Sequence, residues 1–191
     1  MAPGLLAFPL QFVPHRDPLS PTLWWIIMAV IAALTAHIYL RFRRIRRNAS
    51  DVGTSAIAGY AAAVLFTILL FPDRLEVGLA VLSILAFGDG SASLFGQMFR
   101  GPSLPWNPGK SWSGFLAFVF VGGLMTAWIY WGECRNPEAA EPPLAFSRTL
   151  LLTTPAVALC ALIESIPSRI NDNIRVGVTA ALSLILLSLF R

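Results

Sequence analysis

The stretch VGLAVLSILAFGDGSASLF at residues 77–95 indicates the fold class of this chain. It begins as an apolar run and then meets Gly88, Asp89 and Gly90 before small residues follow. Crossing about 30 Å of hydrocarbon takes about 20 predominantly apolar residues. A run of this length with a single carboxylate is typical of a membrane helix that ends in a polar segment.

The rest of the chain repeats this pattern. Of the 191 residues, 56% are hydrophobic and 13% are charged. We predict an all-α protein, a polytopic membrane helix bundle of about six spans that forms a single domain over residues 1–191. The spans are expected at 22–40, 54–71, 77–95, 112–131, 150–163 and 174–190. The third and fifth are expected to be broken or incomplete helices, because one runs into Gly88–Gly90 and the other is short and contains Pro155.

The basic residues predict the orientation. Five arginines directly follow the first apolar run, at positions 41, 43, 44, 46 and 47. Cytoplasmic loops are enriched in lysine and arginine, so we place this loop in the cytoplasm, with nine basic residues inside and five outside. We therefore expect an integral protein of a bacterial inner membrane, with its active site facing the cytoplasm. We read the cluster as a topology signal and expect no nucleic-acid partner, while a homo-oligomer stays open.

Three polar segments that are distant in sequence should reach this cytoplasmic face. They are residues 88–96, residues 107–111, and Glu164 with residues 171–173. Asp89 stands out because a carboxylate near lipid depth must be paired, hydrated or bound to a cation. Small residues around it leave backbone amides accessible to a phosphate group. The alternative is a helix-packing segment of small residues with an interfacial aspartate.

The segment Gly109-Lys110-Ser111 resembles the end of a P-loop. A P-loop requires a glycine where this chain has Leu104, so we do not expect a Walker site. Lys110 can still serve as a point charge for phosphate, and Asn107 can donate an amide hydrogen bond. The alternative is a lysine that snorkels at the start of the fourth span, with Ser111 as the helix N-cap.

Glu164 and Asp172 are separated by Pro167, which predicts a turn between them. The turn would bring the two carboxylates together, and with Asp89 they could hold one or two magnesium ions through oxygen ligands and water. The alternative is three unrelated interfacial acids that pair with Arg169 and Arg175.

Taken in order, these residues resemble a known family. Gly88-Asp89 with Ala92 and Gly96, then Asn107, Lys110-Ser111 and Gly114, then Glu164 and Asp172-Asn173, resemble the dolichol kinase and phytol kinase family, which includes a CTP-dependent diacylglycerol kinase. The resemblance is strongest over residues 85–178. It implies a kinase that uses CTP in preference to ATP and phosphorylates the hydroxyl of a membrane lipid alcohol, such as a polyprenol or dolichol, phytol or diacylglycerol.

The resemblance and the residue chemistry together assign candidate roles. The expected catalytic residues are Asp89, Lys110, Glu164 and Asp172, and the expected Mg²⁺ ligands are Asp89, Glu164 and Asp172. The residues expected to bind the nucleotide are Gly88, Gly90, Ser91, Gly96, Asn107, Lys110, Ser111 and Asn173.

Two other functions share part of this chemistry. A phosphatidate cytidylyltransferase-like nucleotidyl transferase would also use CTP and a lipid, but the chain lacks that family's His-Gly-Gly followed by Asp-Arg and Asp. In a small membrane transporter or assembly factor, charges would line a path across the bilayer. The predicted spans carry no carboxylate at the midplane, which favours an enzyme.

Overall fold

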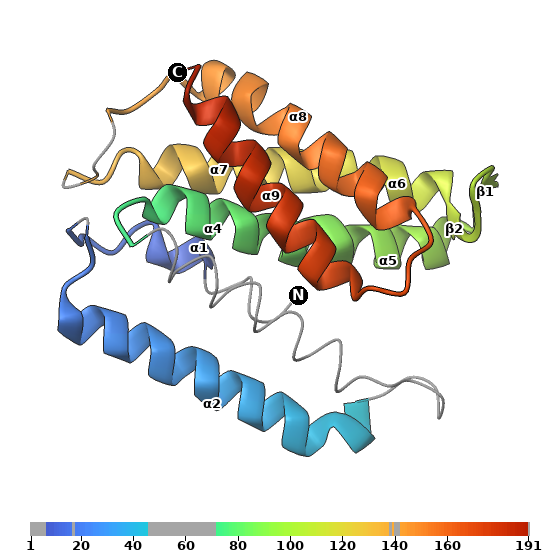
Figure 1. Ribbon diagram of the computed structural model, residues 1–191, viewed down its shortest axis with the longest axis horizontal. Helices are drawn as coiled ribbons and strands as arrows, with labels where there is room; N and C mark the ends of the chain where they lie inside the picture. The colour runs from blue at the N-terminus through green and yellow to red at the C-terminus, as the bar shows by residue number, and fades with distance from the viewer. Residues whose placement is uncertain (1–6, 17, 46–71, 138, 140–141, 191) are drawn as a thin grey trace.

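The computed structural model describes residues 7–16, 18–45, 72–137, 139 and 142–190. Its helices are α1 (Ala7–Leu10), α2 (Pro21–Ile45), α4 (Leu75–Ser83), α5 (Asp89–Phe99), α6 (Trp112–Ala117), α7 (Gly123–Glu133), α8 (Phe146–Ser165) and α9 (Asp172–Ser188). Two π-helical segments, η2 (Ile84–Gly88) and η3 (Phe118–Gly122), join α4 to α5 and α6 to α7. Figure 1 shows α4–α5 and α6–α7 running along the length of the molecule, with α9 crossing in front of them at an angle.

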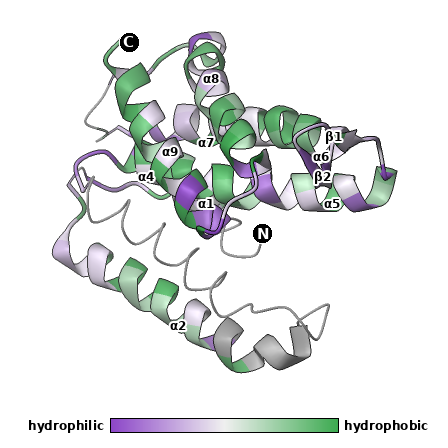
Figure 2. Ribbon diagram, turned by 45° about the vertical axis from the view of Figure 1, so that its right-hand side comes forward, coloured by the Kyte–Doolittle hydropathy of each residue, from purple (hydrophilic) through white to green (hydrophobic). Residues whose placement is uncertain are grey.

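The described chain is mostly helical, and three of its helical stretches are long and apolar enough to cross a membrane. They cover Leu75–Phe99, Trp112–Glu133 and Phe146–Ser165. The apolar part of α2 and the 17-residue α9 are shorter. The predicted second span at 54–71 lies outside the described residues, so six spans stays a prediction. Figure 2 shows apolar residues along the helices and hydrophilic ones mainly at helix ends and loops.

The prediction that the third and fifth spans are broken was wrong. The third continues through η2 as one helix from Leu75 to Phe99, because a π-helical turn absorbs the irregularity without ending the hydrogen-bonded backbone. The fifth is a full helix that passes through Pro155. In the turn before the proline, the hydroxyls of Thr153 and Thr154 donate to the carbonyls of Thr149 and Leu150 (3.0 and 2.6 Å). Such side chains help a membrane helix tolerate proline.

Helix α4 is the centre of the bundle. All of its residues are buried, and it packs against α7 and α9. Without a strong hydrophobic force between helices in lipid, close packing of small residues has to supply the attraction. The two π segments show this, since a Cβ on Gly122 would lie 2.9 Å from the Cα of Gly88. A side chain at either glycine would push η2 and η3 apart.

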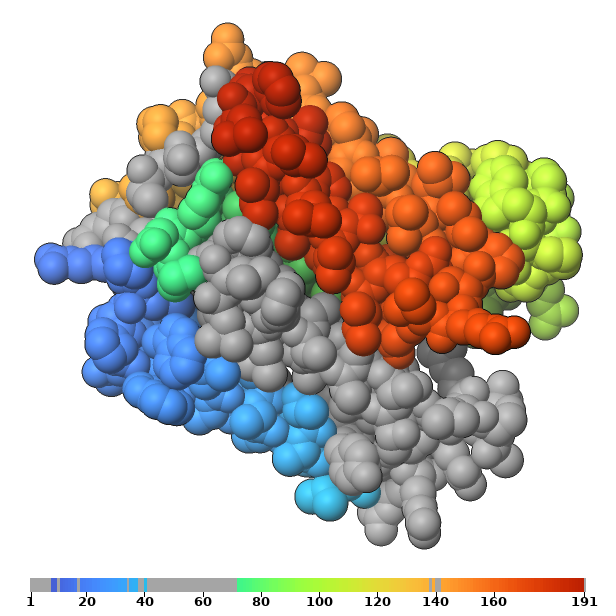
Figure 3. Space-filling view, viewed as in Figure 1, coloured from blue at the N-terminus to red at the C-terminus, as the bar shows by residue number. Residues whose placement is uncertain are grey.

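A short hairpin projects from one end of the bundle. Strands β1 (Ser103–Leu104) and β2 (Asn107–Ser111) pair antiparallel with an irregular register, and β2 leads directly into α6. Figure 3 shows the hairpin at this end, beside the last turns of α8. The C-terminal end of α2, which carries Arg41, Arg43 and Arg44, lies toward the same end of the molecule (Figure 1).

Candidate active site

The polar cluster at the hairpin end is built around Lys110. Its ammonium donates hydrogen bonds to the carboxylate of Glu164 and to the backbone carbonyl of the same residue, the latter at 2.6 Å. The carboxylate of Asp172 lies 3.6 Å from the same nitrogen. Strand β2 therefore brings a lysine to two acids that lie beyond α6, α7 and most of α8 in the chain. The prediction that these segments meet is confirmed for these three residues.

The turn between α8 and α9 is held by Arg175. Its guanidinium donates to the carbonyls of Ile163 (2.7 Å) and Ile166 (3.0 Å) and to the carboxylate of Asp172 (3.2 Å). Lys110 and Arg175 thus both bind backbone carbonyls at the C-terminus of α8, where the helix dipole favours cations. The alternative that paired Asp172 with Arg175 is confirmed for that pair. The sequence analysis named Arg175 as a possible partner of the acids and missed that it also holds this turn through two backbone carbonyls.

The hairpin is fastened to the last residue of α8. The indole nitrogen of Trp106 donates to the hydroxyl of Ser165 (3.0 Å), and the side-chain amide of Asn107 donates to its carbonyl (2.9 Å). The amide oxygen of Asn107 accepts from the backbone nitrogen of Gly109 (3.1 Å). Asn107, predicted to donate to phosphate, therefore positions the loop that carries Lys110. The sequence analysis did not identify Trp106 or Ser165 as part of this contact. The one signal in the sequence is that an aromatic residue, Trp106, directly precedes Asn107.

Asp89 begins α5 and is half-buried. The charges of Glu164, Lys110 and Asp172 all act on its carboxylate, so it belongs to the same electrostatic cluster. Among the described residues, no lysine, arginine or histidine forms an ion pair with Asp89. The half-buried Gly90 follows it, and Asn173 follows Asp172 in the first turn of α9.

Two of the predicted nucleotide-binding residues lie in a helix interface. The hydroxyl of Ser91 donates to the carbonyls of Gly88 (2.9 Å) and Ala117 (3.1 Å), and it is buried. A Cβ on Gly88 would lie 2.7 Å from the ring of Phe118. Gly88 and Ser91 thus pack between η2–α5 and the α6–α7 helix, as the helix-packing alternative describes, and nucleotide binding by them stays a prediction.

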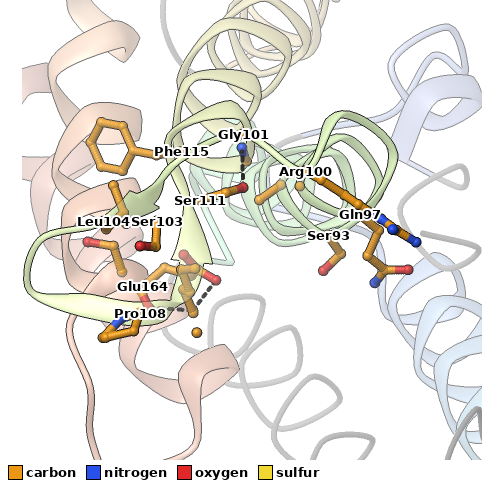
Figure 4. A pocket seen from close by; sticks show the side chains of 16 residues that line it. Ser93, Gln97, Arg100, Gly101, Ser103, Leu104, Pro108, Ser111, Phe115 and Glu164 are labelled. Carbon is orange, nitrogen blue, oxygen red and sulfur yellow. Dashed lines mark hydrogen bonds and ion pairs between the residues drawn. The ribbon is translucent and has the colours of Figure 1, made fainter.

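A pocket of about 380 Å³ opens beside this cluster. Figure 4 shows its walls, which come from α5, the hairpin, the start of α6 and the end of α8. Four of the predicted site residues line it, namely Gly96, Lys110, Ser111 and Glu164. The lining residues that were not predicted include Ser93, Gln97, Arg100 and Ser103. Asp89 and Asp172 are not among the lining residues. Ser111 also caps α6, accepting from the backbone nitrogen of Gly114 (3.2 Å), as its alternative role predicted.

The predicted magnesium ligands are Asp89, Glu164 and Asp172. Within the described part of the chain, no three His, Cys, Asp or Glu side chains are grouped so that they could hold a metal ion. The carboxylate of Glu164 is bound to Lys110, and that of Asp172 contacts Arg175 and Lys110. Protein sites often hold Mg²⁺ by one or two carboxylates together with substrate phosphates. The donor set fits a metal that arrives with a polyphosphate, and it does not fit a three-carboxylate cage.

The fold and the pocket define a class of protein: a helical membrane protein with a charged pocket at one end of its bundle. Sequence comparison places it more narrowly. The chain is 30% identical over 132 residues to probable phytol kinase 1, chloroplastic, of Oryza sativa subsp. japonica, covering 67% of this chain and 40% of the rice protein. It is 27% identical over 127 residues to phytol kinase 1, chloroplastic, of Arabidopsis thaliana (65% and 40%), and 27% identical over 128 residues to farnesol kinase, chloroplastic, of the same plant (65% and 40%).

These matches confirm the predicted resemblance, and in sequence the chain is polyprenol and phytol kinase-like. The chain spans about two fifths of the length of these relatives. No family model and no solved structure matches it.

Proposed function

We propose that this chain is a lipid alcohol kinase, which transfers the terminal phosphoryl group of a nucleoside triphosphate to the hydroxyl of a membrane lipid alcohol. The observation that carries the proposal is the meeting of Lys110 with Glu164 and Asp172 beside a polar pocket, in a chain similar to phytol and farnesol kinases. Phosphoryl transfer asks a protein mainly for positioning and for neutralisation of charge. A lysine held between two acids at a pocket wall suits that task.

Each residue then has a role that follows from its contacts. Lys110 stabilises negative charge on the phosphates, while Glu164 holds the lysine in place and orients the lipid hydroxyl. The oxygen of that hydroxyl forms the new P–O bond, the bond to the bridging oxygen of the diphosphate breaks, and the hydroxyl proton passes to a nearby carboxylate. Ser111 and Gly96 form the pocket wall against which the phosphates lie.

Magnesium is part of this proposal, because Asp89 and Asp172 offer carboxylate oxygens to a metal that enters with the nucleotide. When bound, it would neutralise charge on the phosphates. In the same cluster, Gly90 next to Asp89 and Asn173 next to Asp172 would contact the metal-bound phosphates. CTP is the proposed donor, in preference to ATP, on the family resemblance alone.

The proposed substrate is an isoprenoid alcohol. The relatives are named for phytol and farnesol, and both alcohols carry a primary hydroxyl on an apolar chain. Such a chain can remain in the bilayer while its hydroxyl reaches the end of the bundle. Polyprenol, dolichol and diacylglycerol also carry a hydroxyl on an apolar body, so they are tested as substrates alongside phytol and farnesol. We place the active face in the cytoplasm, because the C-terminal end of α2, whose sequence is rich in arginine, lies toward the same end of the molecule as the hairpin (Figure 1).

The experiment follows the label of the terminal phosphate. Purified protein in detergent receives CTP or ATP labelled at the gamma position, Mg²⁺, and each lipid alcohol in turn. We expect labelled lipid phosphate together with unlabelled nucleoside diphosphate. Lys110→Ala should lose this transfer, while Arg169→Ala, which changes an exposed cation of the α8–α9 turn outside the pocket, should retain it.

Two results would contradict the proposal. Label released as pyrophosphate would indicate nucleotidyl transfer to a lipid phosphate. Transfer to lipid that is equal in Lys110→Ala and Arg169→Ala would show that the Lys110 cluster is not the site of the reaction.

A further inference from the structure

Arg100 holds a backbone conformation that its residue type disfavours. It follows α5 with φ 42° and ψ 43°, and it is the sole non-glycine residue with positive φ among those described. The left-handed conformation at a helix C-terminus normally belongs to glycine, because a Cβ there meets the neighbouring backbone. Here the glycine stands one position later, at Gly101. An arginine kept in a strained position beside a pocket suggests that its side chain has a function.

The charge of the pocket points to the same residue. Lys110 is bound to Glu164 and lies near Asp172, so its positive charge is already balanced by acids. Arg100 also lines the pocket, and in the described part of the chain no carboxylate pairs with it. The two cations come from different elements of the pocket lining, since Lys110 belongs to β2 and Arg100 follows the last residue of α5. Arg100 is therefore the pocket cation whose charge is still available to a ligand.

We propose that Arg100 is a phosphate-binding residue, which holds the non-transferred phosphates of the nucleotide across the pocket from Lys110. This inference rests on the proposed function. A guanidinium can bind two phosphate oxygens at once through parallel hydrogen bonds. Gln97 and Ser93, one and two helical turns earlier on the same wall, add neutral donors. The left-handed turn fixes the backbone of Arg100 beside the pocket, and a glycine there would leave this wall without a cation.

The test uses the backbone strain to separate binding from folding. Arg100→Gly removes the cation and supplies the residue that the left-handed conformation prefers, so its thermal unfolding temperature should stay the same or rise. Its affinity for nucleoside triphosphate should fall by about tenfold or more, as expected when a hydrogen bond to a charged group is lost. Arg100→Lys should restore part of the affinity, and Arg169→Gly serves as the matched change in a cation outside the pocket.

Binding is measured by titration of nucleoside tri-, di- and monophosphate in detergent, without lipid alcohol. In the wild type, affinity should rise with the number of phosphates, and in Arg100→Gly this dependence should largely disappear. Equal affinity of wild type and Arg100→Gly for the triphosphate would overturn the proposal, as would no nucleotide binding by the wild type. A loss seen only when anionic phospholipid is added would assign Arg100 to a lipid headgroup and would also overturn it.

Failure of the proposed function has a different result. A chain that binds triphosphate through Arg100 but transfers no label to any lipid alcohol would retain the phosphate-binding site and lose the kinase assignment. If Arg100→Gly transfers phosphate at the normal rate with an unchanged KM for nucleotide, the kinase assignment stands and Arg100 is not part of the nucleotide site.

Discussion

The two ends of the bundle each carry a cluster of acids and bases, and the clusters differ in their access to solvent. At the hairpin end, the side chains of Lys110, Glu164 and Asp172 are 28%, 12% and 47% exposed. At the far end, His15 Nε2 lies 2.7 Å from Glu133 Oε1, with side chains 4% and 1% exposed. Similar pairs of acidic and basic side chains therefore have different roles at the two ends of the bundle. A sealed pair holds elements together, whereas an accessible cluster beside a pocket can exchange partners with a ligand.

The sealed cluster ties the N-terminal segment to the helices. His15 lies in the segment between α1 and α2, and Glu133 is the last residue of α7. The side chain of Asn136 contacts the ring of His15 at 3.1 Å, beyond the end of the same helix. On this end α4 adds a second pair, in which Arg74 binds Glu76 at 3.0 Å and the hydroxyl of Ser188 at 3.1 Å. These contacts join the segment before α2, the start of α4 and the ends of α7 and α9.

The largest effect is expected at the sealed end, and it should be on stability. Glu133→Ala removes the partner of the buried His15 and should lower the free energy of unfolding by about 3 kcal/mol, because a buried polar group is left without its partner. Thermal unfolding in detergent measures this loss. Glu133→Gln keeps an acceptor oxygen for His15 and should cost about 1 kcal/mol. Phosphoryl transfer to the lipid alcohol per folded molecule should stay at the wild-type level, and a specific loss of this transfer would break the contrast between the two ends.

The next effect is expected at the open end, and it should be on transfer. Lys110→Ala should lower the rate of lipid phosphorylation by about 100-fold or more, the size seen when one preorganised charge or donor is removed from a transition state. Its cost in stability should be near 1 kcal/mol, since its ion pair is partly exposed. Lys110→Arg should recover part of the rate, because a planar fork replaces a compact charge. Comparable losses of stability in Lys110→Ala and Glu133→Ala would show that both clusters are structural.

The smallest effect is expected where a site residue also caps a helix. Ser111→Ala removes the hydroxyl that accepts from Gly114 at the start of α6 and should cost about 1 kcal/mol of stability. Ser20→Ala removes a similar cap at the start of α2, where the hydroxyl accepts from Leu23. The stability costs should be similar, while only Ser111→Ala should raise the KM for nucleotide. Equal kinetics in the two variants would limit Ser111 to capping.

Several site residues could be predicted because their chemistry is local. Ser111 at the start of an apolar helix reads as an N-cap, and Lys110 next to it reads as an interfacial cation. The carboxylate of Asp89, at the end of an apolar run, must be paired, hydrated or bound to a cation. Arg100 could not be recognised, because neither its left-handed backbone nor its place in the pocket wall is visible in a sequence where Gly101 stands beside it. Ser91 was expected in the nucleotide site, yet its buried hydroxyl joins α5 to the carbonyl of Ala117.

The sequence by itself determined the helical membrane class, because hydropathy summed over about 20 residues decides whether a segment can cross a bilayer. It also predicted the start of the fourth span at Trp112, where a cap and an apolar run meet. Only the tertiary structure decided which acids meet Lys110 and which cation remains available to a ligand. Those choices depend on how the hairpin is fastened to Ser165 and how Arg175 shapes the turn after α8. Contacts between segments 54 residues apart arise from the packing of whole helices, and no local pattern encodes them.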